Sequence, residues 1–197
     1  MKKIIAIIMS LAILLIAGCS SASEPITTVP LDPETTTVGD VAGTVEGDRY
    51  ISHVGGVAFK LTGDFTVEWP DSDKRSTVFG DYTGIDICGP VIIWNNKSSM
   101  NIAYVLDEKL KEDALKEYTL EERNSHSKYN VKSAEFIDYK IDGKTYPALK
   151  SVLENNGKEA ATLQIYVFQD NGMLVLISIS AKNYSEVDKI TKNLRFA

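Results

Sequence analysis

Apolar residues follow three different patterns along this 197-residue chain. From Ile4 to Ala17 they form a run that only Ser10 interrupts. From about Arg49 onward they mostly alternate with polar or small residues, which is typical of β-strands with one buried face. Near the end, apolar residues recur at helical spacing at Tyr184, Val187, Ile190 and Leu194. The pattern predicts a short apolar leader, then a β-rich domain that closes with a helix.

The strands are expected in pairs. Two alternating runs, 57–61 and 65–69, flank Gly63-Asp64 and predict a hairpin that ends at Pro70. The segment from Asp71 to Pro90 is rich in turn residues, so we expect a long excursion there. Two more strands, 91–94 and 102–106, flank an Asn-Asn-Lys-Ser-Ser turn.

Three Asx-Gly pairs divide the region from 134 to 181 into four apolar, β-branched segments. The pairs are Asp142-Gly143, Asn156-Gly157 and Asn171-Gly172. Asx-Gly favours the positive φ angles of tight hairpin turns. We therefore expect a four-stranded antiparallel meander.

Two helical segments complete the predicted fold. Asp107 can cap the first helix. Capping-box spacing at Thr119 and Glu122 allows the helix to begin again there. The apolar face of the first helix would hold Leu110, Ala114, Leu115 and Tyr118. The last helix can begin at Asn183 with Glu186, or at Ser185 with Asp188. The predicted fold class is α+β, an antiparallel sheet with two helical segments.

The order of elements resembles that of a known superfamily. The hairpin "GVAFKLTGDFTVEW", the segment "NIAYVLDEKL", the meander and the final helix are similar to the PsbP-like α/β/α sandwich. That superfamily includes the photosystem II extrinsic protein, the DcrB-type lipoproteins and a Ran-binding nuclear import factor. The resemblance covers roughly residues 48 to 197 and implies a domain that binds other proteins and is largely non-catalytic.

The leader ends in Ile16-Ala17-Gly18-Cys19, which resembles the bacterial lipobox. Lys2-Lys3, the apolar run and the small residues before Cys19 match the three regions of a secretory signal peptide, 1–18. The resemblance implies diacylglyceryl transfer to the Cys19 sulfur and cleavage before Cys19, with fatty acyl chains such as palmitate as the membrane anchor. Two acyl chains hold a protein stably at a bilayer, whereas one holds it marginally. The alternatives are a plain signal peptide with an incidental cysteine and an uncleaved anchor.

Residues 19–48 are expected to be the lipidated N-terminus and a disordered tether rich in Ser, Thr and Pro. This segment has three prolines and no aromatic residue, so it has little apolar surface to offset the entropy of ordering. About 29 such residues would have an r.m.s. span of roughly 30 Å and a contour limit of roughly 95 Å. The alternative is a first strand from Val38 to Val45, and glycosylation of the threonines stays open. A single α+β domain is expected over 49–197.

The charge balance limits the partners. The chain has net charge −6, and residues 1–18 carry only Lys2 and Lys3, so their removal leaves −8. An acidic chain is a poor candidate for nucleic acid, which is bound largely through lysine and arginine. It also argues against docking on anionic lipid through a basic patch. The apolar run is shorter than the ~20 residues that a membrane-spanning helix needs.

No recognised catalytic or metal motif is present in the sequence. The two histidines, His53 and His126, both lie among polar or turn residues, and no nucleophile elbow, Cys-x₂-Cys pair or phosphate-binding glycine loop occurs. Asp71-Ser72-Asp73 lacks the glycine and distal glutamate of a calcium loop. We therefore predict no catalytic residue, no metal site and no cofactor, and only Cys19, for lipid attachment, as a site residue.

Cys88 and the tyrosines are more ambiguous. Once Cys19 is a thioether, Cys88 is a lone thiol, and either a small buried hydrophobe or a reactive centre fits it. Six tyrosines fit either a recognition surface or a half-buried sheet face, and packing in the sheet is the favoured interpretation. They are Tyr82, Tyr104, Tyr129, Tyr139, Tyr146 and Tyr166.

Together these features predict a lipid-anchored binding or accessory module on the extracytoplasmic face of a bacterial cell membrane. It would be non-catalytic and would bind an envelope protein. The 71–90 excursion is a candidate docking segment. An enzyme acting on wall or surface polymers and a lipoprotein that captures small ligands are the alternatives.

Overall fold

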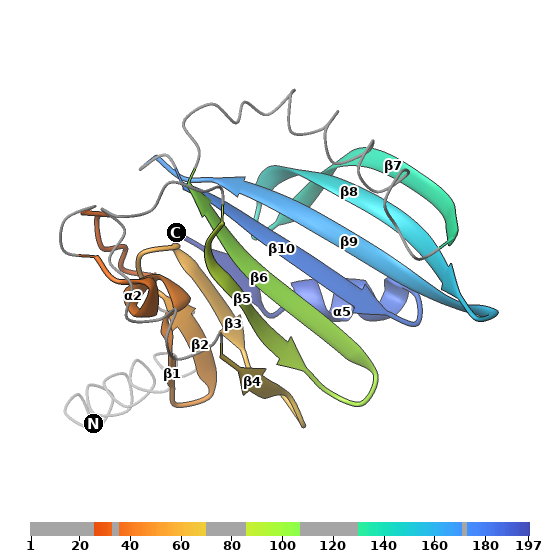
Figure 1. Ribbon diagram of the computed structural model, residues 1–197, viewed down its shortest axis with the longest axis horizontal. Coiled ribbons are helices and arrows are strands. Elements are labelled where there is room, and N and C mark those ends of the chain that lie inside the picture. Colours follow the sequence, from red (N-terminus) through yellow and green to blue (C-terminus); the bar gives the residue numbers. More distant parts are fainter. Residues whose placement is uncertain (1–25, 33–35, 70–85, 107–129, 171–172) are drawn as a thin grey trace, which may run out of the picture.

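A computed structural model describes residues 26–32, 36–69, 86–106, 130–170 and 173–197. These residues form two antiparallel sheets and two helices (Figure 1). The α+β class predicted from the sequence, with a mainly antiparallel sheet, is confirmed. Within the described part of the chain, no helix has the length and apolar character needed to cross a membrane.

The larger sheet has seven strands in the order β4-β5-β6-β10-β9-β8-β7. Its members are β4 (Thr66–Glu68), β5 (Asp86–Trp94), β6 (Ser98–Leu106), β7 (Asn130–Ile141), β8 (Lys144–Asn155), β9 (Lys158–Phe168) and β10 (Met173–Ala181). The last four form the meander that the Asx-Gly pairs predict. Asp142 and Asn156 have φ of 52° and 53°, followed by Gly143 and Gly157 at 81° and 73°, as two-residue hairpin turns require. The third pair, 171–172, lies outside the described residues.

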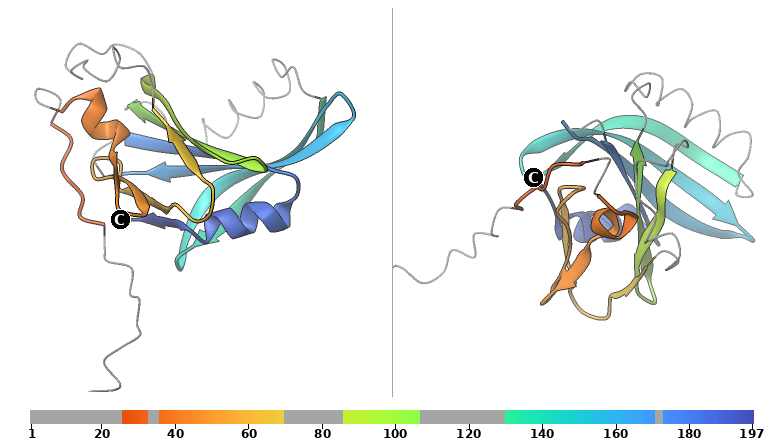
Figure 2. Two further views of the ribbon diagram at one scale, coloured as in Figure 1. Left: turned by 90° about the horizontal axis from the view of Figure 1, so that it is seen from below. Right: turned by 60° about the vertical axis from the view of Figure 1, so that its left-hand side comes forward.

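The smaller sheet has four strands in the order β1-β2-β3-β11. They are β1 (Thr44–Glu46), β2 (Arg49–Ser52), β3 (Val57–Lys60) and β11 (Leu194–Phe196). This sheet and the helix α5 (Tyr184–Thr191) lie on the same side of the large sheet (Figure 2). The short helix α2 (Val38–Ala42) contacts β2 and β5 and thereby touches both sheets.

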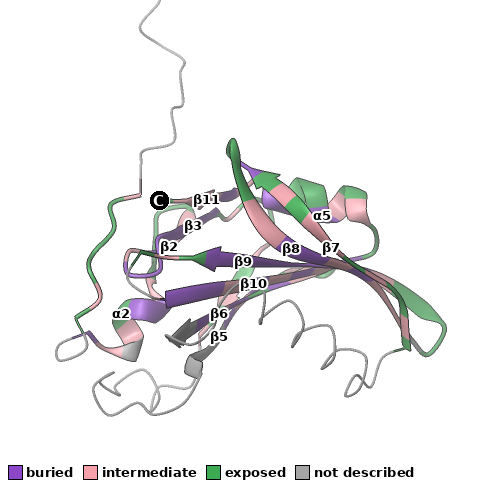
Figure 3. Ribbon diagram, turned by 90° about the horizontal axis from the view of Figure 1, so that it is seen from above, coloured by how far each residue is buried: buried purple, intermediate pink, exposed green. Residues whose placement is uncertain are grey.

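The core fills the space between the two sheets and beneath α5. Tyr50 and Phe59 enter it from the small sheet, Ile93 and Met100 from the large sheet, and Val187 from α5, all fully buried. Figure 3 shows that β9 and β10 are buried along most of their length, whereas the β7–β8 hairpin has exposed ends. A second buried cluster, Leu149, Tyr166 and Leu174, lies on the opposite face of the large sheet.

The predicted hairpin from 57 to 69 is wrong in its pairing, although both strands exist. β3 pairs with β2 and β11, and β4 pairs with β5, so the chain crosses from one sheet to the other between them. Phe59 and Phe65, on either side of the crossing, meet edge to face with ring centroids 5.4 Å apart. Alternation identifies a buried face, but it does not identify the neighbouring strand.

The last helix ends earlier than predicted. Asn183 is its N-cap and accepts a hydrogen bond from the Glu186 backbone N–H, which settles the choice between the two predicted starts. Leu194, expected on the helix's apolar stripe, lies instead in β11, where it pairs with Phe59 and is fully buried. An apolar residue at this position is compatible with either a helix or a strand, so the sequence pattern does not distinguish the two.

The folded domain begins before residue 49, so the predicted boundary of the tether at Asp48 is wrong. Thr37 caps α2 with a capping box that includes Asp40, and Val41 and Ala42 are fully buried. β1 then pairs with β2. The alternative of one strand from 38 to 45 is wrong for residues 38–42, which are helical. Burial of Val41 and Ala42 in the core offsets part of the entropy cost of ordering this segment.

Other predictions meet the limits of the described residues. The two strands around the Asn-Asn-Lys-Ser-Ser turn are confirmed as β5 and β6. β5 starts at Asp86, so the expected excursion is too long by its last five residues. Residues 70–85 and the helix expected from Asp107 lie outside the described residues, as does the second helical layer that the α/β/α resemblance implies.

Candidate functional site

A basic pocket of about 250 Å³ lies on the outer face of the small sheet, the face turned away from the core. Four cationic side chains and one carboxylate, Glu46, contribute its charges. The cations are Arg49, Lys60, Lys192 and Arg195. Since the whole chain has net charge −6, this grouping of positive charge is local.

Strand alternation places the cations on one face. In β2, β3 and β11 the fully buried Tyr50, Phe59 and Leu194 point into the core, so their neighbours Arg49, Lys60 and Arg195 point outward. Arg49 and Lys60 are direct cross-strand partners. Like charges in this position repel each other, and the repulsion is offset in part by Glu46, the cross-strand partner of Arg49 on β1, and by Asp48 beside Lys60.

Nearby carboxylates neutralise only part of this charge. Asp48 lies 3.7 Å from Lys60 Nζ, and both side chains are more than half exposed, so the pair is weak and exchangeable. Arg49 and Lys192 form no ion pair with another described residue. These two cations are therefore available to a ligand.

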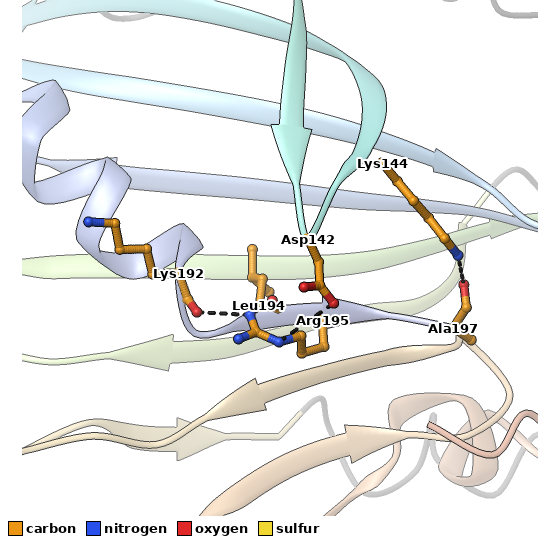
Figure 4. A network of polar contacts seen from close by, with 6 residues as sticks. All are labelled: Asp142, Lys144, Lys192, Leu194, Arg195 and Ala197. Carbon is orange, nitrogen blue, oxygen red and sulfur yellow. Dashed lines mark hydrogen bonds and ion pairs between the residues drawn. The ribbon is translucent and has the colours of Figure 1, made fainter. Parts of the chain in front are cut away.

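Arg195 is held in place by backbone and by the β7–β8 turn (Figure 4). Its Nη1 donates to the carbonyls of Lys192 and Leu194 at 2.9 and 2.6 Å, and its Nε lies 3.7 Å from Asp142 Oδ2. At the same edge, Lys144 Nζ donates to the Ala197 carbonyl at 2.7 Å. Arg195 is thus a fixed positive charge at one side of the pocket.

Residues 26–32, here called the N-terminal strap, are fastened to the small sheet. The Val29 N–H donates to the His53 carbonyl at 3.1 Å, and His53 Nδ1 lies 2.7 Å from the Thr27 carbonyl. His53 Nε2 lies 3.4 Å from Glu46 Oε1. Ile26 and Thr27 line the basic pocket, so the start of the described chain lies at its rim. His53 lies in the turn after β2 with its side chain 39% exposed, and it holds the strap.

A second surface feature lies on the outer face of the large sheet, on the opposite side of the molecule from the basic pocket. It is a shallow groove of about 610 Å³. Trp94 lies in it and is 39% exposed. Trp94 pairs with Ser99 on β6, and Ser99 pairs with Ser180 on β10, so the aromatic ring begins a row of small hydroxyls across three strands. Asn101 and Glu68 add hydrogen-bonding groups nearby.

A buried hydroxyl network connects the two sheets between these surfaces. Tyr50 Oη lies 2.6 Å from Tyr104 Oη and donates to the Ala42 carbonyl at 2.9 Å. Ser52 Oγ donates to the Val41 carbonyl at 2.7 Å. The network connects α2 to both sheets and gives these buried hydroxyl groups hydrogen-bond partners.

The tyrosines act mainly in packing, as the favoured interpretation predicted, for the four that are described. Tyr104 and Tyr166 are buried, and Tyr139 and Tyr146 are partly buried. Burial is the main reason why the pKa values of Tyr139 and Tyr146 are raised above 10. Tyr139 Oη donates to Asp188 Oδ1 at 2.7 Å and thereby connects β7 to α5. Tyr82 and Tyr129 lie outside the described residues.

The other predicted residues are not brought together into a site. Cys19 and His126 lie outside the described residues, and Cys88 is placed only by its backbone in β5. Among the described side chains, no group of three or more His, Cys, Asp or Glu could hold a metal ion. The basic pocket was missed because β2 and the strap fell in or beside the expected tether. Alternation at Arg49-Tyr50-Ile51-Ser52 was the available signal.

Comparisons with known proteins give similarity of fold only. No family model and no curated protein sequence matches the chain. Protein PA94 of Pseudomonas aeruginosa, a candidate regulator of unknown function, has 10% identity and a TM-score of 0.43, covering 68% of this chain and 99% of its own. The solution structure of cyanobacterial PsbP from Synechocystis sp. PCC 6803 has 14% identity and a TM-score of 0.46, covering 79% of this chain and 96% of its own.

Proposed function

We propose that this protein is a non-catalytic binding module, anchored by lipid on Cys19 to the extracytoplasmic face of a bacterial membrane, that binds an envelope protein. The anchor part rests on the signal-peptide pattern and on the small residues before Cys19. The binding part rests on one observation, the groove around the exposed Trp94.

The chemistry of this groove suits a polypeptide. Tryptophan is enriched at the energetic centres of protein interfaces, because it provides a large apolar surface and one hydrogen-bond donor. Serine, asparagine and carboxylate groups around Trp94 can pair with backbone N–H and C=O groups of a partner. The groove is shallow and wide, which fits a protein segment better than a small metabolite, whose sites bury most of the ligand surface.

The anchor is tested by the variant Cys19→Ala in the native host. Radiolabelled palmitate should be incorporated into the wild type and lost in the variant, and the variant should leave the detergent phase in detergent partition. Equal labelling and equal partition of the two proteins would refute the anchor.

The groove is tested by cross-linking in native membranes with the variant Trp94→Ala and the matched control Phe168→Ala. Phe168 is 40% exposed against 39% for Trp94, and it lies on the same face of the large sheet, outside the groove. One cross-linked partner should be lost with Trp94→Ala and kept with Phe168→Ala. A partner set that is the same in all three proteins would refute binding at the groove.

A further inference from the structure

We infer that the basic pocket binds the phosphate headgroups of anionic lipids in the membrane to which the protein is anchored. The inference rests on the Cys19 anchor of the proposed function, and it assigns the pocket a role separate from that of the Trp94 groove. Three observations carry it, namely the distance that the chain allows, the charges of the pocket and the arrangement of the two faces.

The first observation is the length of chain between the lipid and the pocket. The N-terminal strap, residues 26–32, is bonded to the small sheet through Val29 and His53, so the chain is attached to the domain from about Ile26 onward. Only residues 20–25 separate Cys19 from Ile26. Whatever their conformation, they place Ile26 at most about 25 Å from the acylated sulfur. Because Ile26 and Thr27 line the pocket, the pocket itself stays close to the bilayer.

The second observation is the set of charges. Arg49, Lys60, Lys192 and Arg195 surround one hollow, and its lining holds a single carboxylate, Glu46. Arginine binds phosphate through paired N–H donors and lysine binds it as a point charge. A phosphate between Arg49 and Lys60 would also relieve the repulsion of these cross-strand partners. Asp48 and Asp142, each 3.7 Å from a cation, are exposed and can be displaced from their pairs by a stronger anion.

The third observation is the position of the pocket relative to the groove. The pocket is on the outer face of the small sheet and the groove is on the outer face of the large sheet, with the core between them. If the pocket faces the lipid, Trp94 faces away from the bilayer and is accessible to an envelope protein. The attraction acts over about 10 Å or less at physiological salt, so the short tether is what makes it effective.

The source of the phosphate is tested with the lipidated protein purified from host membranes. Its intact mass is measured first, and the protein is then inserted into preformed vesicles of phosphatidylcholine, with or without phosphatidylglycerol. Lysines are acetylated briefly with an N-hydroxysuccinimide ester, and labelling at Lys60 and Lys192 is measured by peptide mass spectrometry. Lys158, exposed at the β8–β9 turn, is the internal reference.

Acetylation of Lys60 and Lys192 should slow roughly fivefold on vesicles with phosphatidylglycerol, the effect of about one cation at an anionic surface, while Lys158 is unchanged. In the double variant Arg49→Ala/Lys60→Ala, Lys192 should lose this protection. The matched variant Lys158→Ala should keep it. Circular dichroism spectra of all variants confirm that the fold is retained.

Equal acetylation of Lys60 and Lys192 on vesicles with and without phosphatidylglycerol overturns the inference. Any protection would then come from proximity to the bilayer and not from the anionic headgroup. Protection by inorganic phosphate to the same extent in detergent, without vesicles, overturns the lipid as the source. An intact mass without acyl chains is a different failure, because it refutes the anchor of the proposed function and removes the basis of the inference. An acylated protein without protection refutes the inference alone.

Discussion

The variant Gly55→Ala is expected to destabilise the domain by about 3 kcal/mol, at the upper end of the range for overpacked cores. A methyl group on Gly55 would collide with the Tyr104 ring and lie 2.8 Å from Ser52 Oγ. Neither neighbour can move freely. Tyr104 is fully buried and its hydroxyl lies 2.6 Å from that of Tyr50, while Ser52 Oγ is bonded to the Val41 carbonyl and to the Gly55 N–H.

Thermal unfolding followed by circular dichroism measures this effect. For a chain of this size, about 3 kcal/mol corresponds to a fall in Tm of roughly 6 to 12 °C. The control is Gly47→Ala, a position with φ of 59° and nothing within 4 Å of the added Cβ, which reports backbone strain without a clash. Gly47→Ala should cost only about 1 kcal/mol, because a non-glycine residue there adopts a left-handed conformation.

A double-mutant cycle decides whether the collision with Tyr104 is the cause. In the background of Tyr104→Ala, which removes the ring, Gly55→Ala should cost much less than in the wild type. If Gly55→Ala changes Tm by less than about 2 °C, or costs the same in both backgrounds, the close packing of the 52–56 turn against β6 is wrong.

Three further variants test other parts of the structure. Thr37→Ala removes the capping box of α2 and should lower stability by about 1 kcal/mol in urea denaturation; no change would mean that α2 is not part of the folded domain. Leu194→Ala should cost about 2 to 5 kcal/mol, because this side chain is fully buried in β11, whereas a cost below about 1 kcal/mol would contradict its place in the core. The variant Tyr139→Phe should lose less free energy of unfolding at alkaline pH than the wild type. Burial raises the folded-state pKa of Tyr139 above the unfolded value of 10, so its stabilisation is complete below pH 10 and is lost as pH rises through the raised value; identical pH profiles for the two proteins would contradict this.

Local signals in the sequence predicted where strands and turns lie much better than which strands pair with each other. Asp142-Gly143 and Asn156-Gly157 determine their hairpins through backbone preference alone, so the meander followed directly. The pairing of β3 with β2 and β11 depends on segments far apart in the chain, and no short pattern around Phe59 encodes it. Leu194 illustrates the same limit, because an apolar residue after a helix fits the helix or a following strand equally well.

The candidate surfaces were hidden for a related reason. Trp94 was expected in a strand, but its exposure depends on which face of the sheet the core covers. The basic pocket joins residues from the strap, β2, β3 and the C-terminal strand, so it exists only once these segments are assembled. Net charge gave no indication of it. A total of −6 is compatible with many distributions of charge, so it does not exclude a local basic patch.

Charge distribution, rather than net charge, determines how such a molecule would be oriented at a membrane. The lining of the pocket holds four cations and one carboxylate, a net charge of +3, so the rest of the chain carries −9 out of the total of −6. Near an anionic bilayer the acidic surface is repelled and the pocket attracted, and both effects turn the molecule the same way. In the proposed lipid-anchored form, the short tether would limit translation and the charges would limit rotation. Trp94, on the opposite face, would then point away from the membrane, where the proposed envelope partner could reach it. If the proposed acyl anchor is present, higher salt should weaken this orientation without detaching the protein, because screening acts on the charges and leaves hydrocarbon burial intact.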